Sequence, residues 1–260
     1  MGLFVVSRAD AAEDEDPEDA DVAPPLPRLL AISWQLETGA ASTYVFRGRL
    51  QYASRRDPSS QSTIGVTSNE VGPGAVSLTG WNATALVHAS GQQGTAAEVD
   101  LTAAYAWTIG RRFETQVGYT AYFYPRALAA KHADGAHGLF TTVSVKNGFL
   151  TPFVGVYPEL VRMHGAYATA GVMKTVDILR GFSLTPQASV GGAGCQGYTS
   201  HLNDVSAMLV ALRTFSDGMY LSCRAAWSFM GGPRSRLPTD AVVTSSRSVP
   251  WGMVAMGISR

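Results

Sequence analysis

The sequence predicts an all-β protein, a closed antiparallel transmembrane β-barrel of about 12 strands with short periplasmic turns and longer external loops. Three observations predict this fold class. Apolar and polar residues alternate with period two from Ile32 onward, short turns alternate with longer connections, and only 15% of the residues are charged. A water-facing surface usually carries about 25–35% charged residues. We therefore expect something other than water to face much of this chain.

The alternation predicts individual strands with one apolar and one polar face. In the stretch 97–109, for example, Val99, Leu101 and Tyr105 alternate with Asp100 and Thr102. Most of the expected strands reach the roughly 9–11 residues that cross a tilted bilayer span. The expected strands are 32–50, 61–71, 74–86, 97–109, 112–125, 137–147, 149–157, 164–176, 182–191, 203–214, 218–230 and 249–259.

Turn residues separate these strands in a regular order. Short turns are expected at Gly72-Pro73, Gly110-Arg111, Asn147-Gly148, Leu179-Arg180-Gly181 and Ser216-Asp217, and they alternate with longer connections such as 126–136 and 231–248. Outer-membrane barrels show this asymmetry, with the tight turns and both chain ends on the periplasmic side. Pro152 and Pro186 oppose the prediction, because each removes a ladder donor within an expected strand.

The rival fold is a soluble barrel or sandwich, which has the same period but turns its apolar face inward. Its polar face would meet water and should be rich in Lys and Glu. The polar positions here are mostly Gly, Ala, Ser and Thr, and the chain has three lysines. This composition favours the membrane barrel.

The chain divides into three parts. Residues 1–11 are typical of the end of a secretory signal peptide, with mature protein expected from near Ala12, although a disordered cytosolic N-terminus remains the alternative. Residues 12–27 are acidic and Pro-rich and predict a solvated, disordered tail, and residues 28–260 form the expected barrel. Cys195 and Cys223 have no metal-ligand spacing, and the strand 203–214 should separate them, so we expect no disulfide.

Short motifs in the first half of the chain resemble a family of uncharacterised proteobacterial outer-membrane barrels, Gcw_chp. Residues 44–48 read Tyr-Val-Phe-Arg-Gly, similar to the Tyr-x-Phe-Arg-Gly signature of that family. Further matches follow in order at Gly80-Trp81-Asn82-Ala83, Glu98-Val99-Asp100 and Tyr122-Phe123-Tyr124-Pro125. The resemblance covers about Trp34 to Pro125, and it implies an outer-membrane location and a barrel architecture without a known substrate.

Charged residues of both signs fall on the face expected to line the lumen. Unpaired charges there are unfavourable unless they are bonded or hydrated. They either form a salt-bridged plug that staples opposite walls or line a narrow water-filled pore and set its solute preference. These residues are Glu37, Arg47, Arg49, Glu98, Asp100, Glu114 and Arg224.

Aromatic residues lie near the ends of the expected strands. This placement is typical of the interfacial girdles of membrane barrels, and a sugar-stacking platform is the alternative. The candidate girdle residues are Trp34, Tyr44, Tyr105, Trp107, Tyr124 and Trp251.

These observations lead to three functional hypotheses. The first is a non-enzymatic outer-membrane barrel of a Gram-negative bacterium, in particular a narrow small-solute channel. The second is a rim hydrolase or lipid-modifying enzyme that uses one of the five histidines with Asp134 or Asp204, and the third is a structural or adhesive barrel. Expected partners are outer-membrane lipid, lipopolysaccharide, the barrel-assembly machinery and a small solute. No catalytic residue, metal site or cofactor is assigned, and the net charge of zero gives no argument for a nucleic-acid partner.

Overall fold

The computed structural model describes residues 31–46, 49–50, 58–86, 96–125, 136–160, 165–195, 198–230 and 248–260. The predicted segments 1–11 and 12–27 lie outside these residues. Within the described residues no helix is long and apolar enough to cross a membrane.

The described chain is almost entirely β-strand. Its strands are β1 (Ile32–Ala41), β2 (Val45–Phe46), β3 (Arg49–Leu50), β4 (Ser59–Val71), β5 (Gly74–Ala85), β6 (Ala96–Ile109), β7 (Phe113–Phe123), β8 (Ala136–Val145), β9 (Thr151–Glu159), β10 (Gly165–Met173), β11 (Val176–Leu179), β12 (Phe182–Cys195), β13 (Tyr198–Thr214), β14 (Met219–Met230) and β15 (Ser248–Ser259).

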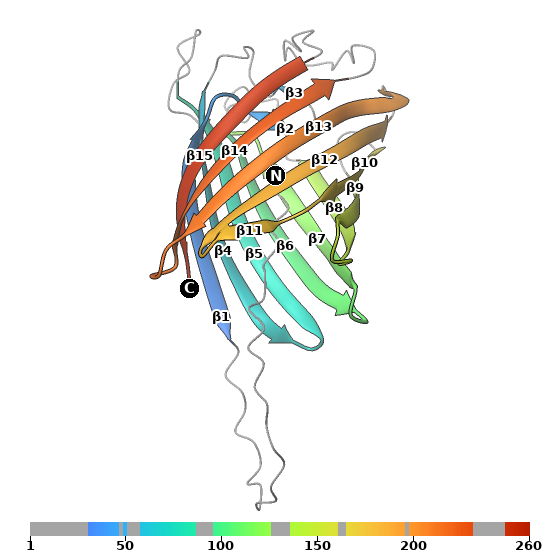
Figure 1. The fold of residues 1–260 in the computed structure, drawn as a ribbon. Coiled ribbons are helices and arrows are strands. Elements are labelled where there is room, and N and C mark those ends of the chain that lie inside the picture. Colours follow the sequence, from blue (N-terminus) through green and yellow to red (C-terminus); the bar gives the residue numbers. More distant parts are fainter. Residues whose placement is uncertain are drawn as a thin grey trace, which may run out of the picture.

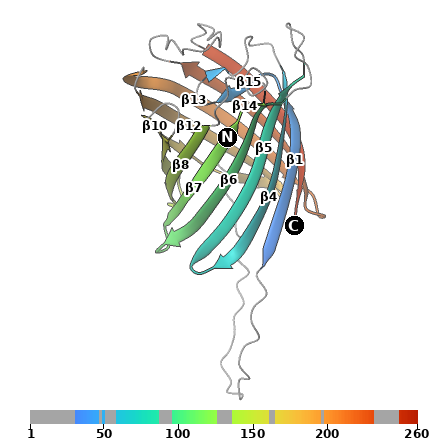
Figure 2. The same cartoon turned by 180° about the vertical axis from the view of Figure 1, so that it is seen from behind.

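The strands close into a barrel of tilted antiparallel strands (Figures 1 and 2). Each main strand pairs with its sequence neighbour, β1 pairs with β15, and β10 pairs with β12. Because β10 and β11 both pair with β12, they form two parts of one barrel strand. The barrel therefore has 12 strands, and the predicted fold class is confirmed.

Short turns gather at the lower end of the barrel in Figure 1, which we call the short-turn end. Each of the five turns holds one glycine with a positive φ, a conformation that glycine adopts without steric penalty. These glycines are Gly72, Gly110, Gly148, Gly181 and Gly218. The opposite end, from which the longer connections leave, is the loop end. The predicted alternation of short and long connections is only partly confirmed. At the loop end, ten residues join β5 to β6 and twelve join β7 to β8, but only two join β12 to β13.

The first predicted strand, 32–50, is wrong in its second half. The strand β1 ends at Ala41, and the chain then turns so that Thr43 and Tyr44 are buried. The residues that follow form the separate hairpin β2–β3. Alternation continues through this segment, so the local pattern did not reveal that the chain leaves the wall.

The two prolines that opposed the prediction lie where the pairing is interrupted. The backbone N–H of Lys174 donates to the carbonyl of Pro186, but proline has no N–H to return the bond. This position falls in the break between β10 and β11. Pairing between β8 and β9 likewise stops at Phe153, the residue that follows Pro152 in the sequence. The ladder therefore tolerates both prolines at local irregularities.

Candidate functional site: the barrel interior

Alternate residues of each strand face either the outside or the interior of the barrel. Outward residues are apolar and exposed, with Leu78 61% and Met256 62% exposed, whereas inward Thr120 and Ser222 are 1% and 2% exposed. Ala103 is exposed on the outer face, and its neighbour Ala104 is buried on the inner face. The predicted assignment of faces on this strand agrees with the structure.

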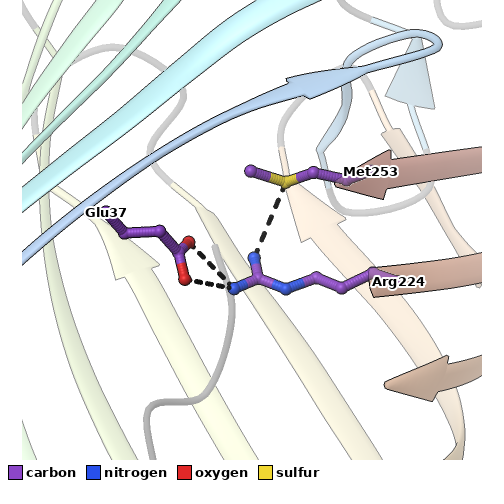
Figure 3. A network of polar contacts seen from close by, with 3 residues as sticks. All are labelled: Glu37, Arg224 and Met253. Atoms are coloured by element: carbon purple, nitrogen blue, oxygen red, sulfur yellow. Dashed lines mark hydrogen bonds and ion pairs between the residues drawn. The ribbon is translucent and has the colours of Figure 1, made fainter. Parts of the chain in front are cut away.

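Glu37 and Arg224 form an ion pair inside the barrel (Figure 3). The Arg224 Nη2 donates to both Glu37 carboxylate oxygens at 2.9 and 3.0 Å, and its Nη1 lies 3.7 Å from the Met253 Sδ. The Glu37 side chain is 5% exposed and that of Arg224 is 20% exposed. The pair is thus largely removed from water.

The Glu37–Arg224 pair lies along one wall of the barrel. Glu37 is on β1 and Arg224 on β14, the two strands that flank β15. The inner row between them holds small residues, with Gly39 directly opposite Ala255. This pair therefore does not staple opposite walls, as one of the two sequence interpretations required. It crosses the seam at which the first and last strands close the barrel.

Tyr44, expected in the aromatic girdle, instead lies inside the barrel. It is 3% exposed, its hydroxyl donates to the Glu98 Oε2 at 2.7 Å, and its ring centroid is 5.2 Å from that of Trp81. Burial and the nearby Glu98 and Asp100 carboxylates raise the pKa of the Tyr44 phenol. The phenol therefore stays neutral and remains a hydrogen-bond donor.

Tyr124 and Trp251 are also wrong as girdle residues. Tyr124 is half-buried just beyond the end of β7, and burial, followed by the Glu98 and Asp100 carboxylates, raises the pKa of its phenol. Trp251 packs inside against the buried cluster that contains Met253. Near the start of β15, around Trp251, the inward and outward residues are both apolar, so their alternation does not distinguish the two faces.

Three of the predicted girdle residues do lie on the outer face near the short-turn end. Trp34 is 41% exposed, and the Tyr105 and Trp107 rings stack with centroids 5.4 Å apart. The Tyr105 hydroxyl also donates to the Val71 carbonyl at 3.0 Å. These positions suit side chains at a membrane–water interface, where the apolar ring contacts lipid and the polar group finds a hydrogen-bond partner.

The remaining predicted charges lie apart from the Glu37–Arg224 pair. Glu114 accepts a 2.7 Å ion pair from Lys146 near the short-turn end, whereas Glu98 and Asp100 are buried near the loop end. The side chains of Arg47 and Arg49 lie outside the described ones. Among the described residues, no group of three His, Cys, Asp or Glu side chains could hold a metal ion.

The β7–β10 wall carries inward aromatic residues that the sequence reasoning missed. A Cβ atom on Gly118 would overlap the Phe140 ring, and one on Gly171 would overlap the Phe153 ring. Both pairs sit directly opposite each other on adjacent strands. Each glycine thus makes room for a ring to lie flat on the wall, an arrangement that also supports the glycine backbone. The signal was available only once the register was known.

Burial inside the barrel differs between its two ends. Near the loop end, inward Ala83, Ala85 and Glu98 are 0%, 1% and 2% exposed. Near the short-turn end, Gln35 and Gln116 are only half-buried. Exceptions near the short-turn end are the buried residues Ser144, Phe153 and Met173 on β8–β10 and Ser222 on β14. The half-buried inward residues therefore lie mainly toward the short-turn end, and inward residues near the loop end are more completely buried.

The chain has the fold of an outer-membrane β-barrel. It is similar to an outer membrane channel from Pseudomonas putida F1, with TM-score 0.55, 12% identity, and coverage of 95% of this chain and 100% of that chain. It is also similar to the NanC porin, with TM-score 0.51, 9% identity, and coverage of 87% and 98%. A KdgM porin in complex with disordered oligogalacturonate gives TM-score 0.50, 7% identity, and coverage of 87% and 98%. No protein-family model and no curated protein matches the chain.

Proposed function

We propose that this chain is a narrow small-solute channel of the Gram-negative outer membrane and not an enzyme. The observation that carries the proposal is an interior lined by polar side chains that are half-buried toward the short-turn end and more completely buried near the loop end, where we place a constriction. A water-filled pore needs such a lining, whereas a solid core would bury it throughout. The channel and porin folds to which the chain is similar support the proposal.

The constriction is formed where the segment after β1 folds inward. Tyr44 is held there by its hydrogen bond to Glu98 and by its contact with Trp81. These three residues belong to three separate motifs that resemble the Gcw_chp family, and they meet at one place in the barrel. We propose that the chain is a member of that family and that the shared motifs build its constriction.

Because the barrel has an even number of strands, β1 begins and β15 ends at the same end of it. Short turns mark the periplasmic side in barrels of this kind, so we place both termini in the periplasm. The longer connections then face lipopolysaccharide, and assembly requires the barrel-assembly machinery.

Conductance across planar lipid bilayers tests the proposal. Folded wild-type protein should give discrete conductance steps, and Tyr44→Ala should enlarge them because it removes the ring from the constriction. Tyr105→Ala is the matched control, since it removes the same side chain from the outer face. Folding of each variant is checked by its heat-dependent mobility in gels.

Two results would contradict the proposal. If folded wild-type protein gives no discrete conductance under any ionic condition, the barrel is structural or adhesive and not a channel. If Tyr44→Ala and Tyr105→Ala conduct alike, a channel exists but its constriction lies elsewhere.

A further inference from the structure

Four basic residues lie on neighbouring strands and turns at the short-turn end of the barrel. Two are in the turn between β6 and β7, one follows β8 and one follows β10. The backbone N–H of Lys146 donates to the Arg112 carbonyl at 2.8 Å, and the Lys174 ammonium donates to the Gly148 carbonyl. These contacts join the three segments into one surface, which we call the basic patch. Its members are Arg111, Arg112, Lys146 and Lys174.

The basic patch carries an excess of positive charge. All its members are exposed except Lys174, which is half-buried. The Lys146 ammonium pairs with Glu114 at 2.7 Å, and within the described residues no other ion pair involves the patch. Three of its four cations therefore have no carboxylate partner there.

Three further acids lie at the short-turn end, on other strands or turns. Asp177 on β11 and Asp217 between β13 and β14 form no ion pair within the described structure, and the Asp217 Oδ1 accepts the Met219 backbone N–H at 3.2 Å. Glu70 lies on β4, which β5 separates from β6. Exposed cations without counter-charges attract anionic groups over about a Debye length, roughly 8–10 Å at moderate salt.

Exposed apolar side chains border the basic patch. Ile109 and Phe113 pair across β6 and β7 and are 52% and 46% exposed. Phe149, in the turn after β8, is 81% exposed. The stacked Tyr105 and Trp107 rings lie further along the outer face of β6, on the side away from the turn. The patch thus lies just beyond the aromatic girdle, at the level where lipid headgroups meet water.

We propose that the basic patch binds the phosphate of an anionic phospholipid headgroup, whose acyl chains lie along Ile109 and Phe113. Guanidinium and ammonium groups form charge-assisted hydrogen bonds with phosphate oxygens. A zwitterionic headgroup fits less well, because Glu114, the carboxylate beside the patch, already pairs with Lys146. A soluble phosphate ion would gain nothing from the exposed apolar side chains. Binding of the lipid does not depend on the proposed channel function.

Native mass spectrometry of the folded full-length protein tests the lipid site. The protein is held in dodecyl maltoside micelles with equal amounts of phosphatidylglycerol and phosphatidylcholine, and the retained lipids are counted. The wild type should retain phosphatidylglycerol preferentially. A basic residue near an anionic membrane surface contributes a factor of about five in binding. Replacing Arg111→Gln together with Arg112→Gln should therefore lower the ratio of the two retained lipids by roughly 10–25-fold.

The chain offers a control with the same change of charge. Arg213 on β13 and Arg260 after β15 are exposed at the short-turn end but lie away from the basic patch. Replacing both by Gln should leave the lipid ratio unchanged. Heat-dependent mobility in gels checks the folding of each variant. If the Arg111 and Arg112 variant does not fold, Lys174→Gln takes its place, with an expected drop of about fivefold.

Three outcomes would overturn the lipid proposal. The first is equal retention of the two lipids by the wild type. The second is an equal fall of the lipid ratio in the patch variant and the Arg213 and Arg260 variant, or a fall in neither, because the preference would then not belong to the patch. The third is displacement of phosphatidylglycerol by inorganic phosphate at the same concentration, which would assign the patch to a soluble anion.

Discussion

Replacing Arg224 by methionine tests how the barrel seam is stabilised. The substitution keeps an unbranched side chain but removes the guanidinium that bonds both Glu37 oxygens. The Glu37 carboxylate, whose side chain is 5% exposed, then loses its ion-pair partner in the described structure. It keeps the hydrogen bond from Tyr220, so the buried carboxylate still has one hydrogen-bond donor.

The expected loss follows from the geometry of the pair. At 2.9 Å and an effective dielectric constant of about 20, the attraction between unit charges is roughly 6 kcal/mol before desolvation is counted. Breaking a buried pair by removing one partner usually destabilises by about 3–5 kcal/mol. Since Arg224 keeps 20% exposure, we expect the lower end, about 3 kcal/mol.

Urea unfolding of the protein reconstituted in lipid vesicles measures this free energy. The double variant Glu37→Leu with Arg224→Met should recover to within about 1 kcal/mol of the wild type, because a buried ion pair replaced by apolar groups is often neutral. If the single variant loses less than about 1 kcal/mol, or if the double variant is the less stable of the two, the pair does not stabilise the seam as argued.

Two further substitutions test the packing and the membrane face, each by the same unfolding measurement. Gly118→Ala should destabilise by about 1–3 kcal/mol, since its Cβ would overlap the Phe140 ring, whereas Gly80→Ala on the outer face is the mild control. Equal losses in the two would show that the ring moves aside freely. Ala103→Arg should destabilise by about 2–4 kcal/mol, because arginine would face hydrocarbon near mid-strand. Ala106→Arg, at a half-buried inward position, should be tolerated, and the reverse order would exchange the two faces.

Most of the wall could be predicted from the sequence because its signals are local. A strand needs only period-two alternation, and a short turn needs only a glycine that accepts a positive φ, such as Gly110 or Gly148. The segment after Ala41 alternates as well, yet it leaves the wall. Its path depends on the contact between Tyr44 and Trp81, which no local pattern encodes.

The site could be predicted only as a set of inward residues. Alternation placed Glu37 and Arg224 on the inner face, but they are 187 residues apart in the chain. Their pairing depends on closure of β1 against β15 and on the tilt of the strands. The tilt brings Arg224 on β14 next to Glu37 on β1, although the two residues lie in different rows of the ladder. Neither the closure of the barrel nor the tilt of its strands can be read from one sequence. The sequence alone therefore left open whether this ion pair connects opposite walls, and the structure shows that it does not.

Strand topology brings together most residues of the proposed constriction. In an antiparallel meander, residues near the same end of consecutive strands must lie side by side. Trp81 therefore pairs with Asp100, and Asp100 with Tyr122, in one inward row across β5, β6 and β7. The motifs that contain them are separated along the chain because each strand and loop intervenes. Tyr44 joins this row from outside the ladder, so its contact with Glu98 depends on side-chain chemistry and not on register. Removing Tyr44 should therefore open the constriction while leaving the wall intact.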